Sequence, residues 1–428
     1  MSHAVGTLAP LRHRSFAVYF WARAFSSLGT AMAVPALVFA LAERNAGNGI
    51  AEQFSGVGLA LAGRQSGQIL LTLLGGVVAD RYSPLRILAV TNSVNGLLQT
   101  ALGALLVAGS PPMVLVVSWQ WLAGAVTALS VPAAQGLLTG LVPKPEMRQA
   151  QALRTLSTNV VTVIGPALCG VAVAWIRPGW IMVVDGVTWF VAGLVFTRIR
   201  TAGPGRNVTR RAILAKGLKL YASSRWLVLG TGALMVVQVA REGVWLVLGP
   251  PIALHTPSIG ARGWGFALSA QAVGAVAMGV LIARLKFERP LFVPMLAGAA
   301  MGLPLAFFPL IEDWRTLALT SLLAGAGLNI STTYFFAAIY ESVDGNFIGR
   351  VMSIYATAIA LFVPVVQVII PFVASDRSSG QCSVALAGAA LMLATAGYAA
   401  TMATTRTVQS VELEEPELAP QRARTGQA

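Results

Sequence analysis

Long apolar stretches alternate with short polar segments along almost the whole chain. Each stretch holds about 20 or more residues, enough for a helix to cross about 30 Å of hydrocarbon. Backbone groups cannot stay unpaired in lipid, and the stretches do not alternate with a period of two, so they predict membrane helices and not a barrel. Twelve spans are expected, at Val18–Ala42, Phe54–Val78, Ile87–Ala108, Met113–Val142, 153–176, 179–199, 226–250, 264–283, 291–311, 316–338, 351–373 and 383–404.

Composition and charge agree with this pattern. Of the 428 residues, 56% are hydrophobic and 11% are charged, which is more apolar surface than a soluble core of this length buries. The net charge of +14 would suggest nucleic acid in a soluble protein, but here the charges follow the loops. With the N-terminus inside, 22 of the 30 Lys and Arg lie on the inner side, five lie outside and three lie within spans. We therefore expect a multi-pass protein of the cytoplasmic membrane, with both termini cytoplasmic and no nucleic-acid partner.

The longest inner loop divides the spans into two sets of six. Between Arg198 and Arg225 it carries eight Lys or Arg and no Asp or Glu. The expected fold is an all-α membrane protein with twelve transmembrane helices in two six-helix bundles. The expected domains are an N-terminal bundle (1–199), a cytoplasmic basic linker (200–225), a C-terminal bundle (226–404) and a disordered cytoplasmic tail (405–428).

A cluster of glycine and charge lies between the second and third spans. It reads Gly76-Val77-Val78-Ala79-Asp80-Arg81 and is followed by Arg86. Gly76 permits close helix approach, and Asp80 can face the positively polarised start of another helix. The motif therefore suits a contact between the inner ends of two helices.

This motif, in this loop of a twelve-span chain, resembles that of the major facilitator superfamily, and more narrowly of its bacterial proton-coupled drug and siderophore exporters. The resemblance implies that Asp80 contacts the start of span 11 and Arg350, closing the inner face in the outward-open state. The alternative is that Arg81 and Arg86 only retain the loop inside. The chain departs from the family where Ser83 replaces the second glycine and Pro84-Leu85 replaces basic residues.

Span 5 holds a second family-like motif, Gly165-Pro166 followed by Gly170. It resembles the Gly-Pro motif of the antiporter branch. Such a pair bends a helix and gives a close-packed pivot against the opposite half, although a generic membrane-helix kink is the alternative. Span 11 carries Pro364 and Pro371, so an interrupted helix is expected in both halves.

Ionisable side chains inside membrane spans are costly and are therefore the candidates for proton coupling or substrate binding. Five qualify, namely Arg23, Arg64, Asp185, Arg241 and Glu242. Arg64 lies too deep to reach either surface and needs a carboxylate, a carbonyl or a substrate as partner. Asp185 could carry a proton or could be a hydrogen-bonded structural residue. Arg241 and Glu242 are adjacent on one helix and point roughly 100° apart, so we expect separate partners for them, with Glu242 as the second proton candidate.

Resemblance and residues together predict a secondary active transporter, an antiporter that couples proton entry to efflux of a small organic compound such as a drug, siderophore or secondary metabolite by alternating access. An importer or facilitator, or a transport-inactive sensor or scaffold, are the alternatives. An enzyme is not expected, and neither is a metal or a cofactor, because the three histidines and the carboxylates show no ligand spacing. The expected partners are the substrate, protons and the lipid bilayer, for a monomeric chain. Three arginines against two carboxylates within the spans favour an anionic or polar substrate.

Overall fold

The computed structural model describes residues 8–44, 50–137, 140–199, 224–282, 292–343, 345–374 and 376–402. Helices make up almost all of these residues. Within this part of the chain, ten helices are long and apolar enough to cross a membrane. The predicted fold class, an all-helical membrane protein, is confirmed.

Six long helices follow one another in the first half of the chain, and each covers a predicted span. They are α1 (Arg14–Arg44), α2 (Ile50–Arg81), α3 (Pro84–Ala108), α4 (Met113–Leu137), α5 (Met147–Ala172) and α6 (Pro178–Thr197), with the short 3₁₀ helices η1 (Ala9–Arg12) and η3 (Lys144–Glu146) before α1 and α5.

The second half covers six further predicted spans, two of them with broken helices. Span 7 is formed by α8 (Arg225–Gln238), the π-helix η4 (Val239–Trp245) and α9 (Leu246–Leu254). Span 9 is formed by α11 (Phe292–Gly298), η6 (Ala299–Met301), α12 (Gly302–Ala306) and η7 (Phe308–Leu310). The others are α10 (Gly260–Leu281), α13 (Trp314–Ser342), α14 (Gly345–Val373) and α15 (Arg377–Thr401).

These breaks do not fall where the sequence predicted them. Helix α5 stays helical through Pro166, and α14 stays helical through Pro364 and Pro371. The expectation of interrupted helices in spans 5 and 11 was therefore wrong. Proline at these three positions removes a backbone donor without ending the helix, which is tolerated in packed membrane helices.

Other prolines account for the observed breaks. Pro250 and Pro251 in α9 lack the N–H that would bond to carbonyls one turn earlier, directly after the π-helix. Pro304 in α12 likewise cannot donate to the carbonyl of Ala300, which lies in the 3₁₀ turn η6. The ladder of hydrogen bonds thus changes register beside each proline.

The start of α3 explains one departure from the family motif. Ser83 is the N-cap residue, and its hydroxyl accepts a hydrogen bond from the Arg86 backbone N–H at 3.4 Å. Pro84 occupies the first turn, where its fixed φ favours a helix start and no donor is needed. Ser83, Pro84 and Leu85, which replace the glycine and basic residues of the family motif, therefore form the start of α3.

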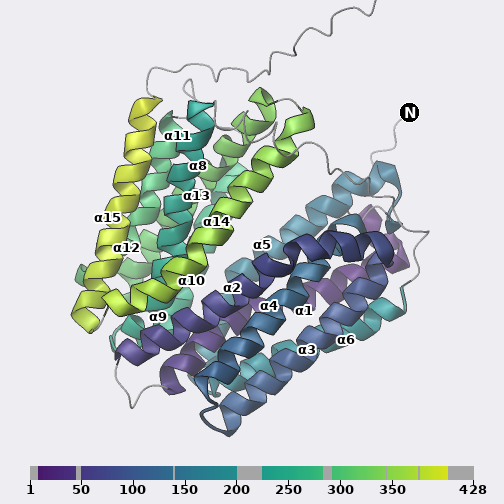
Figure 1. Cartoon of the computed structure of the whole chain (residues 1–428), viewed down its shortest axis with the longest axis horizontal. Coiled ribbons are helices and arrows are strands. Elements are labelled where there is room, and N and C mark those ends of the chain that lie inside the picture. The colour runs from purple at the N-terminus through teal and green to yellow at the C-terminus, as the bar shows by residue number, and fades with distance from the viewer. Residues whose placement is uncertain are drawn as a thin grey trace, which may run out of the picture.

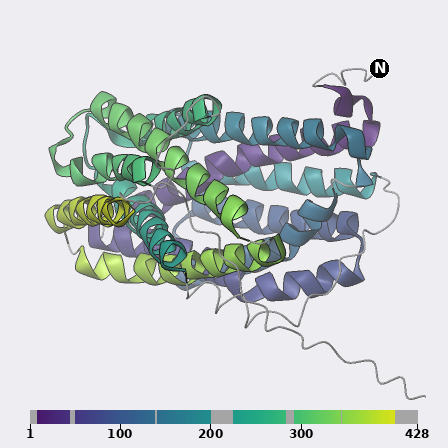
Figure 2. The same cartoon turned by 90° about the horizontal axis from the view of Figure 1, so that it is seen from above.

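The helices form two groups that meet at one end of the molecule and diverge toward the end where the chain starts (Figure 1). Helices α1 to α6 make one group, and α8 to α15 make the other. Seen from above, the green and yellow helices lie mostly on one side and the purple and blue ones mostly on the other, with overlap in the middle (Figure 2). The predicted division into two bundles suits this arrangement, and its exact boundaries stay predictions.

Among the side chains that the structure describes, hydrophobic packing joins the two groups at one end. One cluster contains Phe54 of α2, Trp264 of α10 and Val384 of α15, so it spans both groups. A second cluster, around Phe16, lies within the first group, and a third, around Tyr398, lies within the second. The term closed end is used below for the packed end of the molecule, where α2, α10 and α15 begin.

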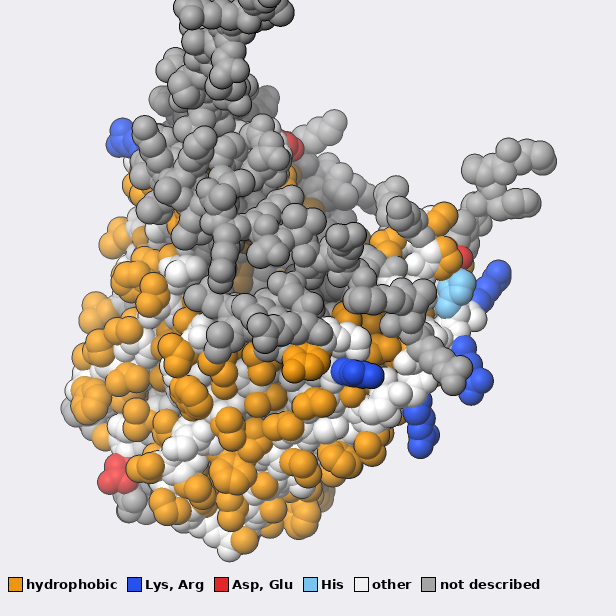
Figure 3. Space-filling view, turned by 45° about the vertical axis from the view of Figure 1, so that its right-hand side comes forward, with side chains coloured by type: hydrophobic (Ala, Val, Ile, Leu, Met, Phe, Trp, Pro, Cys, Tyr) orange, Lys and Arg blue, Asp and Glu red, His pale blue; other side chains and the backbone are white. Residues whose placement is uncertain are grey.

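The outer surface is rich in exposed apolar side chains. Hydrophobic groups cover a broad area in Figure 3, and most of the Lys and Arg in this view lie toward its right-hand edge. Val114, Phe372 and Leu393 are 78%, 79% and 74% exposed, which would be unfavourable over so wide a surface in water. Lipid contact explains this surface.

Candidate functional site

A cavity of about 500 Å³ lies between the two groups of helices. Thr30 of α1 and Trp189 of α6 line it from the first group. Arg241 of η4 and Gln271 of α10 line it from the second. Because both halves contribute to the wall, any movement of one half against the other changes the shape of the cavity and the access to it.

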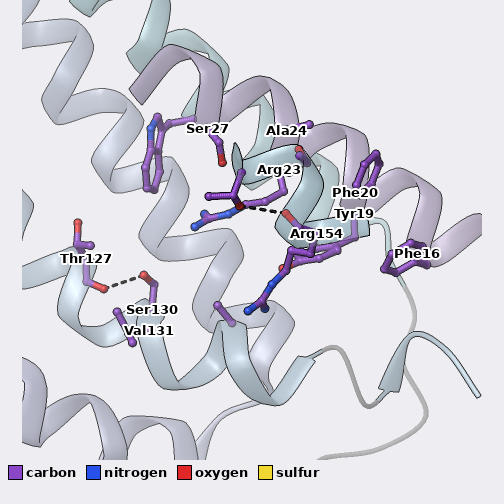
Figure 4. Close-up of a pocket in the computed structure, with 14 residues that line it drawn as sticks. Phe16, Tyr19, Phe20, Arg23, Ala24, Ser27, Thr127, Ser130, Val131 and Arg154 are labelled. Atoms are coloured by element: carbon purple, nitrogen blue, oxygen red, sulfur yellow. Dashed lines mark hydrogen bonds between the residues drawn. The ribbon is translucent and has the colours of Figure 1, made fainter. Parts of the chain in front are cut away.

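A second cavity, of about 350 Å³, adjoins the first in the direction of the start of α1. Both are lined by Arg23, Ser27, Thr158 and Trp189. Arg154 of α5 lines the second cavity, and Figure 4 shows the side chains of Arg23 and Arg154 extending into its space. The two cavities form one site that runs from between the halves toward the end where they diverge.

Asp185 is buried directly behind the wall of this site. Only 2% of Asp185 is exposed. Thr30 Oγ1 lies 3.3 Å from Asp185 Oδ1, and Trp189 Nε1 donates to Thr30 Oγ1 at 2.7 Å. Gly29 leaves room for this approach, because a Cβ there would lie 2.6 Å from Asp185 Oδ1. One layer of side chains therefore separates a buried carboxylate from the cavity.

Arg64 of α2 acts on this carboxylate from another helix. Its positive charge interacts with Asp185, and Gln99 of α3 is a further hydrogen-bonding partner of Asp185. Gly124 of α4 packs against the backbone carbonyl of Arg64 and so holds this part of α2 close to α4. Arg64 and Asp185 are thus opposite charges in the same buried region, although no salt bridge within 4.0 Å joins them among the described side chains.

Arg241 and Glu242 pair with each other, so the prediction of separate partners was wrong. Arg241 Nη1 lies 3.1 Å from Glu242 Oε1. Both side chains are long enough to turn toward each other although their Cα–Cβ bonds diverge, and both belong to the wider π-helical turn of η4. The salt bridge leaves this wall of the cavity without net charge.

Glu242 also links three helices near the closed end. Gln65 Nε2 of α2 lies 3.4 Å from the second carboxylate oxygen of Glu242. Gln367 Nε2 of α14 donates to the Glu242 backbone carbonyl at 3.0 Å. One of these contacts crosses between the halves, so it depends on their relative position.

The Gly-Pro motif of α5 lies against both α1 and α10. A Cβ on Gly165 would overlap Ala31 of α1, and one on Gly170 would lie 2.9 Å from the α10 backbone. On the facing helix, a Cβ on Gly265 would lie 2.6 Å from the carbonyl oxygen of Pro166. Helices of opposite halves are therefore in backbone contact here, and the role of the motif as a pivot stays a prediction.

The other predicted gating residues lie mostly outside the described side chains. This applies to Gly76, Asp80, Arg81 and Arg350, so the predicted contact of Asp80 with the start of span 11 stays a prediction. Arg86 is exposed on the first turn of α3.

Arg154 falls at the inner end of the predicted span 153–176 and was counted only among the inner-side charges, so its place in the site was missed. A signal was present, because Arg154, Thr158 and Thr162 follow one another at a spacing of four. That spacing puts the three polar side chains on one face of α5, and all three residues line the cavities. Gln65 and Thr30 were not among the predicted site residues either.

Two helical groups around a shared cavity are the architecture of a secondary transporter. The sequence profile of the Major Facilitator Superfamily matches residues 19–366. The chain belongs to this superfamily. It is therefore a multi-pass membrane protein that transports a small molecule, and not an enzyme.

Curated relatives are distant. The chain is 27% identical over 128 residues to a staphyloferrin A transporter of Staphylococcus aureus, a match that covers 30% of this chain and 32% of that protein. It is 27% identical over 305 residues to an uncharacterized MFS-type transporter, y4rN, of Sinorhizobium fredii, covering 67% and 72%. The chain thus aligns with about a third of the length of the first relative.

Solved structures share the fold at low identity. A D-xylose-proton symporter superposes with a TM-score of 0.66 at 15% identity, covering 92% of this chain and 99% of that one. The nucleoside transporter NupG gives 0.68 at 9% identity, covering 90% and 99%. A bacterial homologue of the lysosomal transporter Spinster, in an inward-facing and unoccupied conformation, gives 0.63 at 14%, covering 93% and 94%. These likenesses establish the fold alone.

Proposed function

We propose that this protein exports a small organic compound across the cytoplasmic membrane by alternating access, driven by proton entry. The observation that carries the proposal is the buried Asp185, separated by Thr30 and Trp189 from a cavity that both halves line. A carboxylate in that position can change its charge and so affect the wall of the substrate site. The chain is proposed to act as a monomer.

The position of the closed end determines from which side of the membrane the cavity is accessible. In the orientation expected from the loop charges, the termini lie inside, and the closed end then faces outward. The halves are packed at Phe54 and Trp264 and diverge at the other end, so the arrangement corresponds to an inward-facing state. A substrate would enter from the cytoplasm and leave after the closed end has opened.

Proton uptake would act through the partners of Asp185. The ionised carboxylate attracts Arg64 on α2, and neutralisation removes that attraction. Because α2 also touches Glu242 of the other half through Gln65, a change in α2 reaches the contact between the halves. Protonation would thus alter the balance between two bundle arrangements.

Two further observations support an exporter. The Gly165-Pro166 motif resembles that of the antiporter branch of the superfamily, and it lies at a contact between the halves. A distant relative is named a staphyloferrin A transporter, which supports a small organic substrate of the siderophore, drug or metabolite kind.

Flux measurement in proteoliposomes tests the proposal. Metabolite retention and drug susceptibility of a deletion strain first identify the compound, which is then loaded into vesicles of purified protein. Acidifying the outside should accelerate its exit, and a protonophore should remove the acceleration. An exit rate that does not depend on the pH gradient would indicate a facilitator. Faster entry of the compound with an acidic exterior would indicate an importer, and absence of flux would indicate a sensor or scaffold.

A further inference from the structure

We propose that the site selects organic anions, and that Arg23 and Arg154 together hold a carboxylate or another oxyanion of the substrate. This inference deepens the proposed function and rests on it, because the cavity is a substrate site only if the chain transports. It adds Arg154, which the sequence marked only as an inner-side charge, to the residues that contact substrate.

The two arginines are the charged residues of the second cavity. Both line it, one from α1 and one from α5, and their side chains extend into the same space (Figure 4). No Asp or Glu is among the residues that line either cavity. Within the described part of the chain, neither Arg23 nor Arg154 forms a salt bridge, in contrast to Arg241, which is neutralised by Glu242.

Arg23 is held in place by an aromatic ring. Its guanidinium carbon lies 6.0 Å from the centroid of the Trp189 ring, within the range of a cation–π contact. Such a contact orients the guanidinium while leaving its N–H groups free to donate to an anion. The hydroxyls of Ser27 and Thr158 line both cavities and add uncharged donors beside it.

Apolar and aromatic side chains form much of the remaining wall, together with uncharged polar ones such as Thr127, Ser130 and Gln271. Phe16, Tyr19 and Phe20 line the second cavity, and Val34 and Leu246 line the first. Two unpaired cations in a partly dry cleft cost free energy that a bound anion recovers. The arrangement therefore fits a compound with one oxyanion group and an apolar or aromatic body, and it disfavours lipophilic cations.

Charge-selective labelling tests this without knowledge of the substrate. Ser27→Cys, made in a Cys382→Ser background, puts a thiol on the shared wall, while the native Cys169 is buried. The rates of modification by an anionic sulfonatoethyl and a cationic trimethylammonioethyl methanethiosulfonate are compared in nanodiscs of zwitterionic lipid. The ratio of the two rates for 2-mercaptoethanol in solution serves as the reference.

The anionic reagent should be favoured over that reference by at least about tenfold. Arg23→Gln with Arg154→Gln should abolish the preference, and the paired lysine substitutions should keep it. Arg198→Gln, at an exposed arginine that lines neither cavity, should leave it unchanged. If the glutamine pair fails to fold by size-exclusion chromatography, each single glutamine variant should lower the ratio.

Three results would overturn the inference. A ratio at or below the solution value would mean that the site is not anion-selective, and a ratio unaffected by the arginine substitutions would assign the selectivity elsewhere. A preference that disappears in nanodiscs of anionic lipid would mean that a lipid headgroup occupies the arginines. None of these results concerns proton coupling, so failure here is distinguishable from failure of the flux assay.

Discussion

Thr30 and Asp185 are 155 positions apart in the sequence, and their side chains meet at 3.3 Å behind the cavity wall. The stretch from Trp21 to Gly29 resembles the first helix of the superfamily, in which an acidic residue often follows the glycine where this chain has Thr30. Here Asp185 on α6 brings a carboxylate to the same place from the opposite helix. The carboxylate thus comes from a different element, and Thr30 links it to Trp189 and the cavity wall.

Thr30→Val should slow gradient-driven transport while leaving the protein folded. The valine keeps the shape of the side chain but removes the hydroxyl that contacts Asp185 and accepts from Trp189. Loss of one hydrogen bond of about 1 kcal/mol corresponds to about a fivefold effect on rate. Thr30→Ser keeps the hydroxyl and should retain most activity in the same vesicles. Equal activity of the valine and serine variants would contradict the role of the hydroxyl.

Gly265→Ala should open the closed end. The added Cβ would lie 2.6 Å from the Pro166 carbonyl oxygen and would push α10 from α5. Spin labels at positions 52 and 378 should then show a population at longer distance by double electron–electron resonance. Gly397→Ala in α15 is the matched control, because nothing lies within 4 Å of the added Cβ. Identical distance distributions in both variants would show that the backbone contact between α5 and α10 does not restrain opening of the closed end.

Trp264→Ala should destabilise the protein strongly. Trp264 is 1% exposed, its ring centroid lies 4.6 Å from that of Trp245, and it packs over Gly249. Truncation of a large buried aromatic costs about 3–5 kcal/mol. Thermal unfolding in detergent should therefore show a much lower midpoint. Trp175→Ala, which truncates a side chain that is 86% exposed, should change the midpoint little, and a comparable loss in both would argue against this core.

The start of α15 should confer an acid-sensitive part of stability. Hydrogen bonds from the Ser379 backbone and the Ser378 hydroxyl lower the pKa of the Asp376 carboxyl below its ordinary value of 3.8. A lowered pKa in the folded state stabilises above that ordinary value, and the contribution is lost as pH falls below it. Asp376→Asn keeps a neutral cap and should reduce the fall in unfolding midpoint between pH 6 and pH 3. An unchanged fall would place the acid sensitivity elsewhere.

Hydropathy and charge predicted the helices and their order, because burial in lipid requires long apolar segments whatever their partners are. They also marked Arg64 and Asp185 as costly residues that need an explanation. Pairing could not be predicted in the same way. Arg241 and Glu242 contradict a rule based on Cα–Cβ direction, since two long side chains and a π-helical turn bring their ends together.

The location of helix breaks was also beyond the sequence. Prolines occur in intact α5 and α14 as well as beside the breaks in spans 7 and 9, so a proline alone does not determine where a helix breaks. What decides is whether neighbouring helices compensate for the missing hydrogen bond, which is a property of packing. The same holds for Arg154, whose helical spacing with Thr158 was readable but whose cavity is built by four helices.

The central claim is that Asp185 couples proton entry to export, and one comparison tests it most directly. Asp185→Asn and Glu242→Gln are reconstituted side by side, and each is assayed for substrate exchange without a gradient and for exit driven by an acidic exterior. We expect Asp185→Asn to exchange substrate but to lose gradient-driven acceleration by at least about tenfold, the effect of removing an essential proton carrier. Glu242→Gln should keep the acceleration, because its partner is Arg241. Retained acceleration in Asp185→Asn, together with its loss in Glu242→Gln, would contradict the account and would assign the role of proton carrier to Glu242.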